Sequence, residues 1–231
     1  GVNFHVHAGQ ALVIIGGTGS GKSTLINLIP RFYDATQGEV KVNGVDVRNT
    51  TLQAIHQAVA FVPQKANLFE GTLRENMQFG DAKATDEQIW HALEIAQASD
   101  FVKELDRQLD AHVEQGGANF SGGQRQRLAI ARALVKQASV YVFDDSFSAL
   151  DFKTDAKLRA ALKTDEEIQK HDVVIVGQRV STIADADLIL VLDKGKVVGQ
   201  GTHQELLATN KVYQSIVNSQ IRESKEGEQN A

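Results

Sequence analysis

One glycine-rich stretch constrains this chain more than any other part of it. Residues 16–24 read GGTGSGKST and match the pattern Gly-x-x-x-x-Gly-Lys-Ser/Thr of a phosphate-binding loop. The apolar run 11–15 before it predicts a buried strand, and the largely apolar run 25–29 after it predicts the first turns of a helix. This strand–loop–helix order is the context in which the motif binds phosphate, so a chance match in an ordinary turn is disfavoured.

The chemistry of phosphate binding explains these residue types. Glycines let main-chain N–H groups turn toward phosphate oxygens, and the start of the helix adds the positive end of its dipole. The pattern predicts that Lys22 reaches the β- and γ-phosphates and that the Ser23 hydroxyl binds Mg²⁺. The predicted nucleotide-binding residues of this loop are Gly16, Gly17, Thr18, Gly19, Ser20, Gly21, Lys22, Ser23 and Thr24.

A second apolar run, residues 140–143, ends in Asp144. A carboxylate at the carboxyl end of a strand is the expected Mg²⁺ partner of a phosphate-binding loop. Many strands end in Asp, so the signal is weak alone. Its pairing with the loop makes Asp144 the predicted metal-binding carboxylate.

A second glycine motif, Ser121, Gly122, Gly123 and Gln124, opens a helix predicted to run to about residue 136. Glycine costs a helix about 1 kcal/mol relative to alanine, and one Ser is enough to cap a helix. Two glycines instead permit close backbone approach and leave N–H groups free for a second anion. A loosely built cap is the alternative interpretation.

Composition limits the fold and the partners. The chain has 231 residues, of which 42% are hydrophobic, enough for one large domain with a subdomain. Apolar strands alternate with helices, which predicts a mainly parallel α/β sheet. We also predict strands at 2–7 and 39–43, a hairpin at 194–195 and helices at 153–170 and 211–219. A net charge of −5 disfavours nucleic acid as a partner, and no apolar run approaches the ~20 residues of a membrane helix.

Together, these stretches resemble the nucleotide-binding domain of an ATP-binding cassette (ABC) transporter, over residues 1–220. Residues 16–24 resemble its Walker A motif, 140–144 its Walker B motif and 120–124 its signature, while Gln64 resembles the Q-loop and 148–151 the D-loop. The resemblance implies ATP and Mg²⁺ as ligands, with Gln64 beside Ser23 and Asp144 at the metal. It implies a P-loop NTPase core with a mainly parallel sheet, an antiparallel β edge, a helical subdomain at about 66–137 and a polar tail at 221–231.

Three further runs, 31–34, 68–76 and 201–206, resemble domains of exporters. In exporters the membrane helices precede this domain, so a membrane domain is expected upstream of residue 1, and the chain is expected at the cytoplasmic face of the cell membrane. Its transmembrane domains are expected to dock in a groove near Leu68, Phe69 and Glu70. Multidrug export is an expectation from the resemblance alone.

The chain departs from the family pattern at three positions. Asp145 stands where the family has a Glu that polarises the attacking water, and its carboxylate is about 1 Å short, a misplacement that can cost ~100-fold in rate. Gln178 stands where the family has a switch His, and it has no titratable proton. Gln115 replaces a Glu in a run that contacts membrane domains.

Two domains of this family sandwich two ATP molecules, and each site takes its signature from the opposite domain. The predicted catalytic residues Asp145, Gln178 and Gln64 therefore share one site, while the signature 121–124 serves the partner's site. We expect a heterodimer whose second domain carries Glu and His. The alternatives are a homodimer with two slow sites, a soluble ABC ATPase outside transport, and a regulatory module in which ATP only holds the dimer together.

Overall fold

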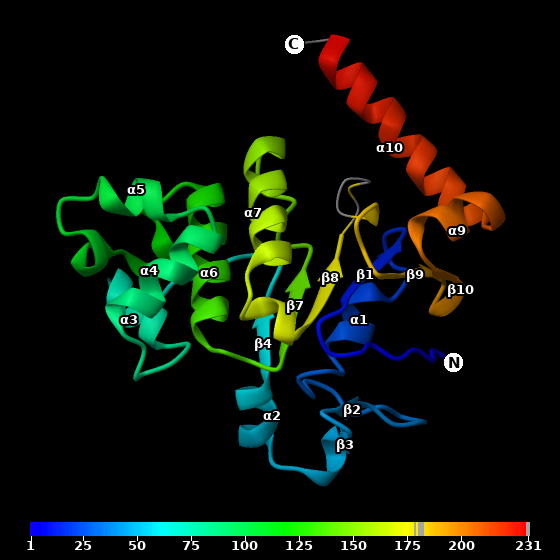
Figure 1. Cartoon of the computed structure of the whole chain (residues 1–231), viewed down its shortest axis with the longest axis horizontal. Coiled ribbons are helices and arrows are strands. Elements are labelled where there is room, and N and C mark those ends of the chain that lie inside the picture. The colour runs from blue at the N-terminus through cyan, green and yellow to red at the C-terminus, as the bar shows by residue number, and fades with distance from the viewer. Residues whose placement is uncertain (178, 180–182, 230–231) are drawn as a thin grey trace.

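The fold is organised around a six-stranded sheet in the order β10-β9-β1-β8-β7-β4 (Figure 1). Neighbouring strands are parallel except β9 and β10, which form an antiparallel edge. The computed structural model describes residues 1–177, 179 and 183–229, with side chains described up to residue 220. The predicted α/β class is confirmed, with strands β1 Ala11–Gly16, β4 Val59–Val62, β7 Val140–Asp144, β8 Asp172–Val176, β9 Leu188–Asp193 and β10 Lys196–Gly201.

The central strands are apolar throughout because both faces of the sheet are covered. In β1 the side chains alternate between two cores. Val13 and Ile15 belong to the larger core, whereas Leu12 and Ile14 belong to the smaller one, and none of the four is more than 1% exposed. A continuous apolar run therefore serves both layers at once.

Helices cover the two faces unequally. The smaller core is closed by α1 Lys22–Ile26, by α2 Leu52–Ala58 and by the short pair β2 Lys41–Val42 and β3 Val45–Asp46. The larger core lies under α7 Phe152–Thr164, α9 His203–Thr209 and the start of α10 Lys211–Gln229.

A helical lobe extends the larger core to one side of the sheet, where the subdomain at 66–137 is expected (Figure 1). Its parts are α3 Leu73–Gln78, α4 Asp86–Ile95, α5 Ser99–Lys103, α6 Gly122–Val135 and the two-residue strands β5 Gly71–Thr72 and β6 His112–Val113. Short 3₁₀ turns occupy Val47–Asn49, Gln108–Asp110, Gln115–Gly117 and Ile168–Lys170.

Several sequence predictions of local structure are wrong. Residues 2–7 form no strand, although their apolar side chains are half-buried against the smaller core. The strand predicted at 39–43 shrinks to β2, which pairs with β3 outside the central sheet. The helix predicted at 153–170 breaks after Thr164, and α10 runs to Gln229, past the predicted helix end at 219 and into the predicted polar tail at 221–231.

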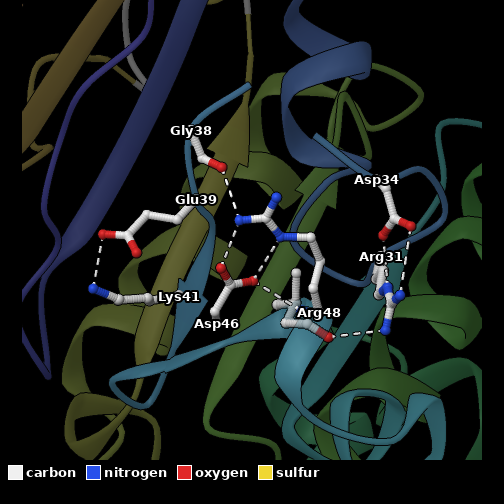
Figure 2. Close-up of polar contacts among 8 residues, drawn as sticks. Arg31, Asp34, Gly38, Glu39, Lys41, Asp46 and Arg48 are labelled. Carbon is white, nitrogen blue, oxygen red and sulfur yellow. Dashed lines mark hydrogen bonds and ion pairs between the residues drawn. The ribbon is translucent and has the colours of Figure 1, made fainter. Parts of the chain in front are cut away.

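Arginine contacts hold the β2–β3 hairpin in place (Figure 2). Arg48 Nη2 donates to Asp46 Oδ2 at 2.7 Å and to the Gly38 carbonyl at 2.9 Å. Hydrogen bonds from Arg48 lower the pKa of Asp46 to about 2. Arg31 Nη1 reaches the Val47 carbonyl at 3.1 Å and so ties the hairpin to the chain after α1.

Within the described residues, no helix is both long enough and apolar enough to cross a bilayer.

The difference in burial between two leucines predicts that they contribute differently to stability. Leu12 is fully buried, so we expect Leu12→Ala to lower the free energy of unfolding by about 2–5 kcal/mol. Leu52 is 52% exposed at the start of α2, and we expect Leu52→Ala to change the free energy of unfolding by less than about 0.5 kcal/mol. Urea titrations followed by circular dichroism measure both values. Equal losses contradict the assignment of Leu12 to a packed core.

Candidate functional site

The predicted phosphate-binding loop joins the carboxyl end of β1 to the start of α1. Gly19 and Gly21 adopt φ values of 76° and 99°, which favour glycine. A Cβ added at Gly17 or Gly19 meets nothing within 4 Å, so these glycines face open space. A rounded ligand can therefore approach the main chain of residues 17–21. Of the predicted loop residues, Ser20 and Lys22 are buried and Gly17, Thr18, Gly19, Ser23 and Thr24 are exposed, with Gly16 and Gly21 intermediate.

The Lys22 ammonium lies inside this loop. Its Nζ donates to the carbonyls of Gly16 at 2.7 Å and Gly17 at 2.9 Å. Burial lowers the pKa of Lys22, while the nearby carboxylates of Asp145 and Asp144 oppose that shift. The amine is thus held by two weak main-chain acceptors and is available for a stronger anionic partner.

Ser23 and Asp144 come together across the sheet, as the sequence predicts. The Ser23 hydroxyl donates to Asp144 Oδ1 at 3.2 Å, although 121 residues separate them. Burial raises the pKa of Asp144, and the contacts with Ser23 and Lys22 oppose that shift. A hydroxyl and a carboxylate are the oxygen ligands that Mg²⁺ takes, so the pair fits a magnesium ion. No group of three His, Cys, Asp or Glu residues that could hold a metal occurs in the described part of the chain.

Gln64 and Asp145 form a second pair at the same edge. Gln64 Nε2 donates to Asp145 Oδ2 at 3.2 Å. Asp145 has a φ of 48°, unusual for a residue with a side chain, and its N–H donates to the Val176 carbonyl at 3.0 Å. Burial, and next the charge of Asp144, raise the pKa of Asp145. Gln178 lies outside the described residues.

The signature residues form a capping box at the start of α6. Ser121 Oγ accepts from the Gln124 N–H at 3.2 Å, and Gln124 Oε1 accepts from the Ser121 N–H at 3.0 Å. Their side chains are therefore used locally, which leaves the main chain of Gly122 and Gly123 as the surface that a ligand could meet. In Figure 1, β4 and β7 lie between α6 and α1. A Cβ added at Gly123 would lie 3.6 Å from the Ala149 carbonyl oxygen, so the start of α6 lies against the loop before α7.

A cavity lies where the sequence predicts a groove, near Leu68, Phe69 and Glu70, but its two apolar residues are not equally exposed. Leu68 is 1% exposed and belongs to the larger core, whereas Phe69 is 45% exposed. A cavity of about 560 Å³ does occur here, lined by residues 67–70 together with Gln115 and Gly116. A main-chain hydrogen bond joins the two runs that line this cavity, because the Gly116 N–H donates to the Leu68 carbonyl at 3.1 Å. The structure thereby joins two runs that the sequence treats separately.

Sequence reasoning missed a neighbouring cavity of about 240 Å³, which shares Phe69. Phe79, 71% exposed, contacts the Phe69 ring with 4.6 Å between centroids. Arg132 of α6 and Lys136, which directly follows α6, also line the cavity, and burial lowers the pKa of both. Phe79 stands between Gln78 and Gly80, and an aromatic residue in such a polar, glycine-containing stretch is the sequence signal that could have revealed it.

Comparison with known proteins decides the family. Residues 1–148 match the family model described as ABC transporter. The chain belongs to the ABC transporter family. An ABC transporter ATP-binding protein of Mycobacterium bovis is 46% identical over 222 residues, which cover 95% of this chain and 38% of that protein. The ATP-dependent lipid A-core flippase of Pseudomonas fluorescens is 44% identical over 213 residues, covering 92% of this chain and 35% of the flippase.

A solved ABC structure supports the same conclusion. The structure of a bacterial Atm1-family ABC exporter with ATP bound has a TM-score of 0.88 and 36% sequence identity, and the match covers 94% of this chain and 38% of that chain. The expected P-loop NTPase-like fold and the exporter type of this ABC nucleotide-binding domain are thus confirmed. The chain spans about 38% of the length of the first curated ABC relatives it matches.

The loop geometry predicts opposite outcomes at two adjacent glycines. A Cβ at Gly16 lies 2.3 Å from the Leu192 carbonyl oxygen and 2.6 Å from Ser20 Oγ, whereas one at Gly17 has open space. We expect Gly16→Ala to cost about 1–3 kcal/mol and so to lower Tm by about 2–10 °C. Gly17→Ala leaves Tm within about 2 °C. Thermal melts of both variants test this, and equal melting temperatures contradict the close approach at Gly16.

Proposed function

We propose that this chain is the ATP-binding motor domain of an ABC exporter. The observation that carries the proposal is the open glycine loop at 17–21 with the Lys22 ammonium inside it and the Ser23–Asp144 pair beside it. ABC family membership supports ATP as the nucleotide. The roles that follow for individual residues are part of the proposal.

The phosphates bind on the main-chain N–H groups of residues 17–21 and on the N-terminus of α1. Lys22 leaves the carbonyls of Gly16 and Gly17 and pairs with the β- and γ-phosphates. Ser23, Asp144 and Gln64 would hold Mg²⁺, which would neutralise charge on the phosphate oxygens. The Gln64 amide, whose nitrogen donates to Asp145, would contribute its oxygen to that site.

Hydrolysis on this chain's own loop is slow in our proposal. Asp145 accepts the Gln64 amide and carries a short carboxylate, so it orients the attacking water poorly. Gln178 orients the γ-phosphate without a titratable proton. The intact signature at 121–124 completes the competent site of a partner domain. Because only the site on this chain's own loop is impaired, the assembly in our proposal is a heterodimer.

Transmembrane domains dock, in our proposal, on the two cavities that meet at Phe69. This surface combines exposed aromatic rings with the cations Arg132 and Lys136, and such mixed patches mark protein interfaces. ATP-driven closure of the dimer moves this surface, and hydrolysis reopens it. The chain then works at the cytoplasmic face of the membrane, and its similarity to a protein named as a lipid flippase supports a membrane setting.

The degenerate site predicts slow ATP turnover that two substitutions repair. We expect the purified chain, concentrated enough to dimerise, to be nearly inactive, and Asp145→Glu with Gln178→His to raise steady-state ATPase activity by about 100-fold. Lys22→Ala in the repaired background removes that gain, because the amine no longer meets the phosphates. A native rate within the usual range of about 1–10³ s⁻¹ contradicts the heterodimer and favours a symmetric homodimer.

The docking surface predicts loss of coupling without loss of ATP binding. Phe79 is 71% exposed, so Phe79→Ala leaves Tm within about 2 °C. In the assembled transporter we expect it to lower transport-coupled ATPase activity at least about threefold, since a buried aromatic anchor contributes about 2 kcal/mol or more to an interface. Leu207→Ala, on exposed α9, is the matched control. An unchanged coupled rate for Phe79→Ala contradicts docking here.

A further inference from the structure

A buried carboxylate lies outside the proposed phosphate-binding site. Asp155 in α7 is fully buried. Its Oδ1 accepts from Arg159 Nε at 3.0 Å and its Oδ2 from Arg179 Nη1 at 3.1 Å. A buried carboxylate needs such partners to stay ionised. Arg159 is one helical turn away, but Arg179 comes from the segment after β8, so the pair joins two separate elements.

Arg179 also uses its remaining donors on the loop before α7. Its Nη2 donates to the Ser148 carbonyl at 3.1 Å and to the Leu150 carbonyl at 2.8 Å. Its guanidinium lies over the Phe152 ring, 4.8 Å from the centroid. Charge-assisted bonds from one planar group set these two carbonyls at a fixed spacing. A simple counter-ion for Asp155 does not require that geometry.

The loop that Arg179 holds is bonded back to Asp145. The Asp145 carbonyl accepts from the Ser148 N–H at 3.3 Å and from Ser148 Oγ at 2.8 Å. The Asp145 N–H donates to the carbonyl of Val176, a residue that stands three positions before Arg179. These contacts close a ring from the end of β7 to the end of β8. The φ of 48° at Asp145 persists only where surrounding contacts impose it, and this ring supplies them.

We propose that Arg179 is a positioning residue for Asp145, acting through the Ser148 carbonyl. It keeps the Asp145 main chain in its left-handed conformation and so aims the carboxylate at the place where Gln64 now contacts it. This rests on the proposed function, in which that carboxylate faces the attacking water. Arg179 itself need not touch the nucleotide.

Two variants separate positioning from mere charge balance. Arg179→Lys keeps a cation for Asp155 but puts all its donors on one atom, which cannot span Asp155 and both carbonyls in the same way. Arg179→Met with Asp155→Asn removes both charges, so no buried carboxylate loses its partner. The matched control is Arg48→Lys, since Arg48 also joins an aspartate to a loop carbonyl, in the distant hairpin (Figure 2).

The experiment uses the full chain at a concentration that gives dimers. ATP affinity is measured first, and then the rate constant for hydrolysis of bound Mg²⁺-ATP in a single turnover. We expect Arg179→Lys and the double variant to lower that rate constant about 10- to 100-fold while the Kd for ATP stays within about threefold. Arg48→Lys leaves both values at the parental level.

Several results overturn the proposal. If Arg179→Lys hydrolyses bound ATP with the same rate constant as the parent chain, the proposal is wrong. If the double variant recovers that rate constant, Arg179 only balances the charge of Asp155. A parent chain that binds ATP but hydrolyses none of it leaves Asp145 with no water to orient, which overturns the proposal while ATP binding stands. A parent chain that binds no ATP refutes the proposed function itself, so the two failures are distinguishable.

Discussion

The parallel pairing of β1 with β8, and of β8 with β7, is the constraint on which the site depends. Ile14 of β1 lies opposite Val176, and Asp144 of β7 lies opposite the same residue on the other side. Because parallel strands end at one edge of a sheet, the phosphate-binding loop and the Asp144–Asp145 pair must emerge side by side. Apolar burial on both faces holds this register, since a one-residue slip moves every side chain of a strand to the wrong core.

The burial that builds the sheet also sets the charges at its edge. It lowers the pKa of Lys22 and raises the pKa values of Asp144 and Asp145, so each group is less easily ionised than in water. One cation faces two carboxylates in this space. In the function we propose, a triphosphate adds further negative charge to this space, which a divalent cation beside Asp144 would offset. On that proposal, Mg²⁺ and the nucleotide would bind together.

Motif chemistry made much of the site predictable from the sequence. A strand that ends in glycine and a strand that ends in Asp144 each have few possible uses, and their pairing through Ser23 follows the prediction. The fold class was equally accessible, because apolar runs of strand length alternate with helices. Signals of this kind are local, and each depends on residues close together in the chain.

The predictions failed where long-range packing decides the structure. Residues 2–7 alternate like a strand but find no hydrogen-bonding partner strand among the described residues, so only their half-burial survives. Leu68 and Phe69 are adjacent and both apolar, yet Leu68 is buried in the core and lines only the first cavity, whereas Phe69 is exposed and lines both. The sequence alone does not show which of the two side chains will be buried. Arg179 was likewise invisible, because its partners Ser148 and Asp155 lie 31 and 24 residues away.

The two pairs at the sheet edge differ in a way that bears on mechanism. The Ser23 hydroxyl and the Asp144 carboxylate already lie side by side, whereas the Gln64 amide nitrogen is bonded to Asp145 Oδ2. The first main-chain N–H groups of α6 follow Ser121 in a capping box, on the far side of β4 and β7 from α1 (Figure 1). In the function we propose, the nucleotide site at the sheet edge and a signature at the start of α6 that serves the opposite domain make an ATP site shared between two domains. The asymmetry we propose comes from Asp145 and Gln178, which both stand in the site of this chain's own loop, while the signature at 121–124 keeps the family pattern.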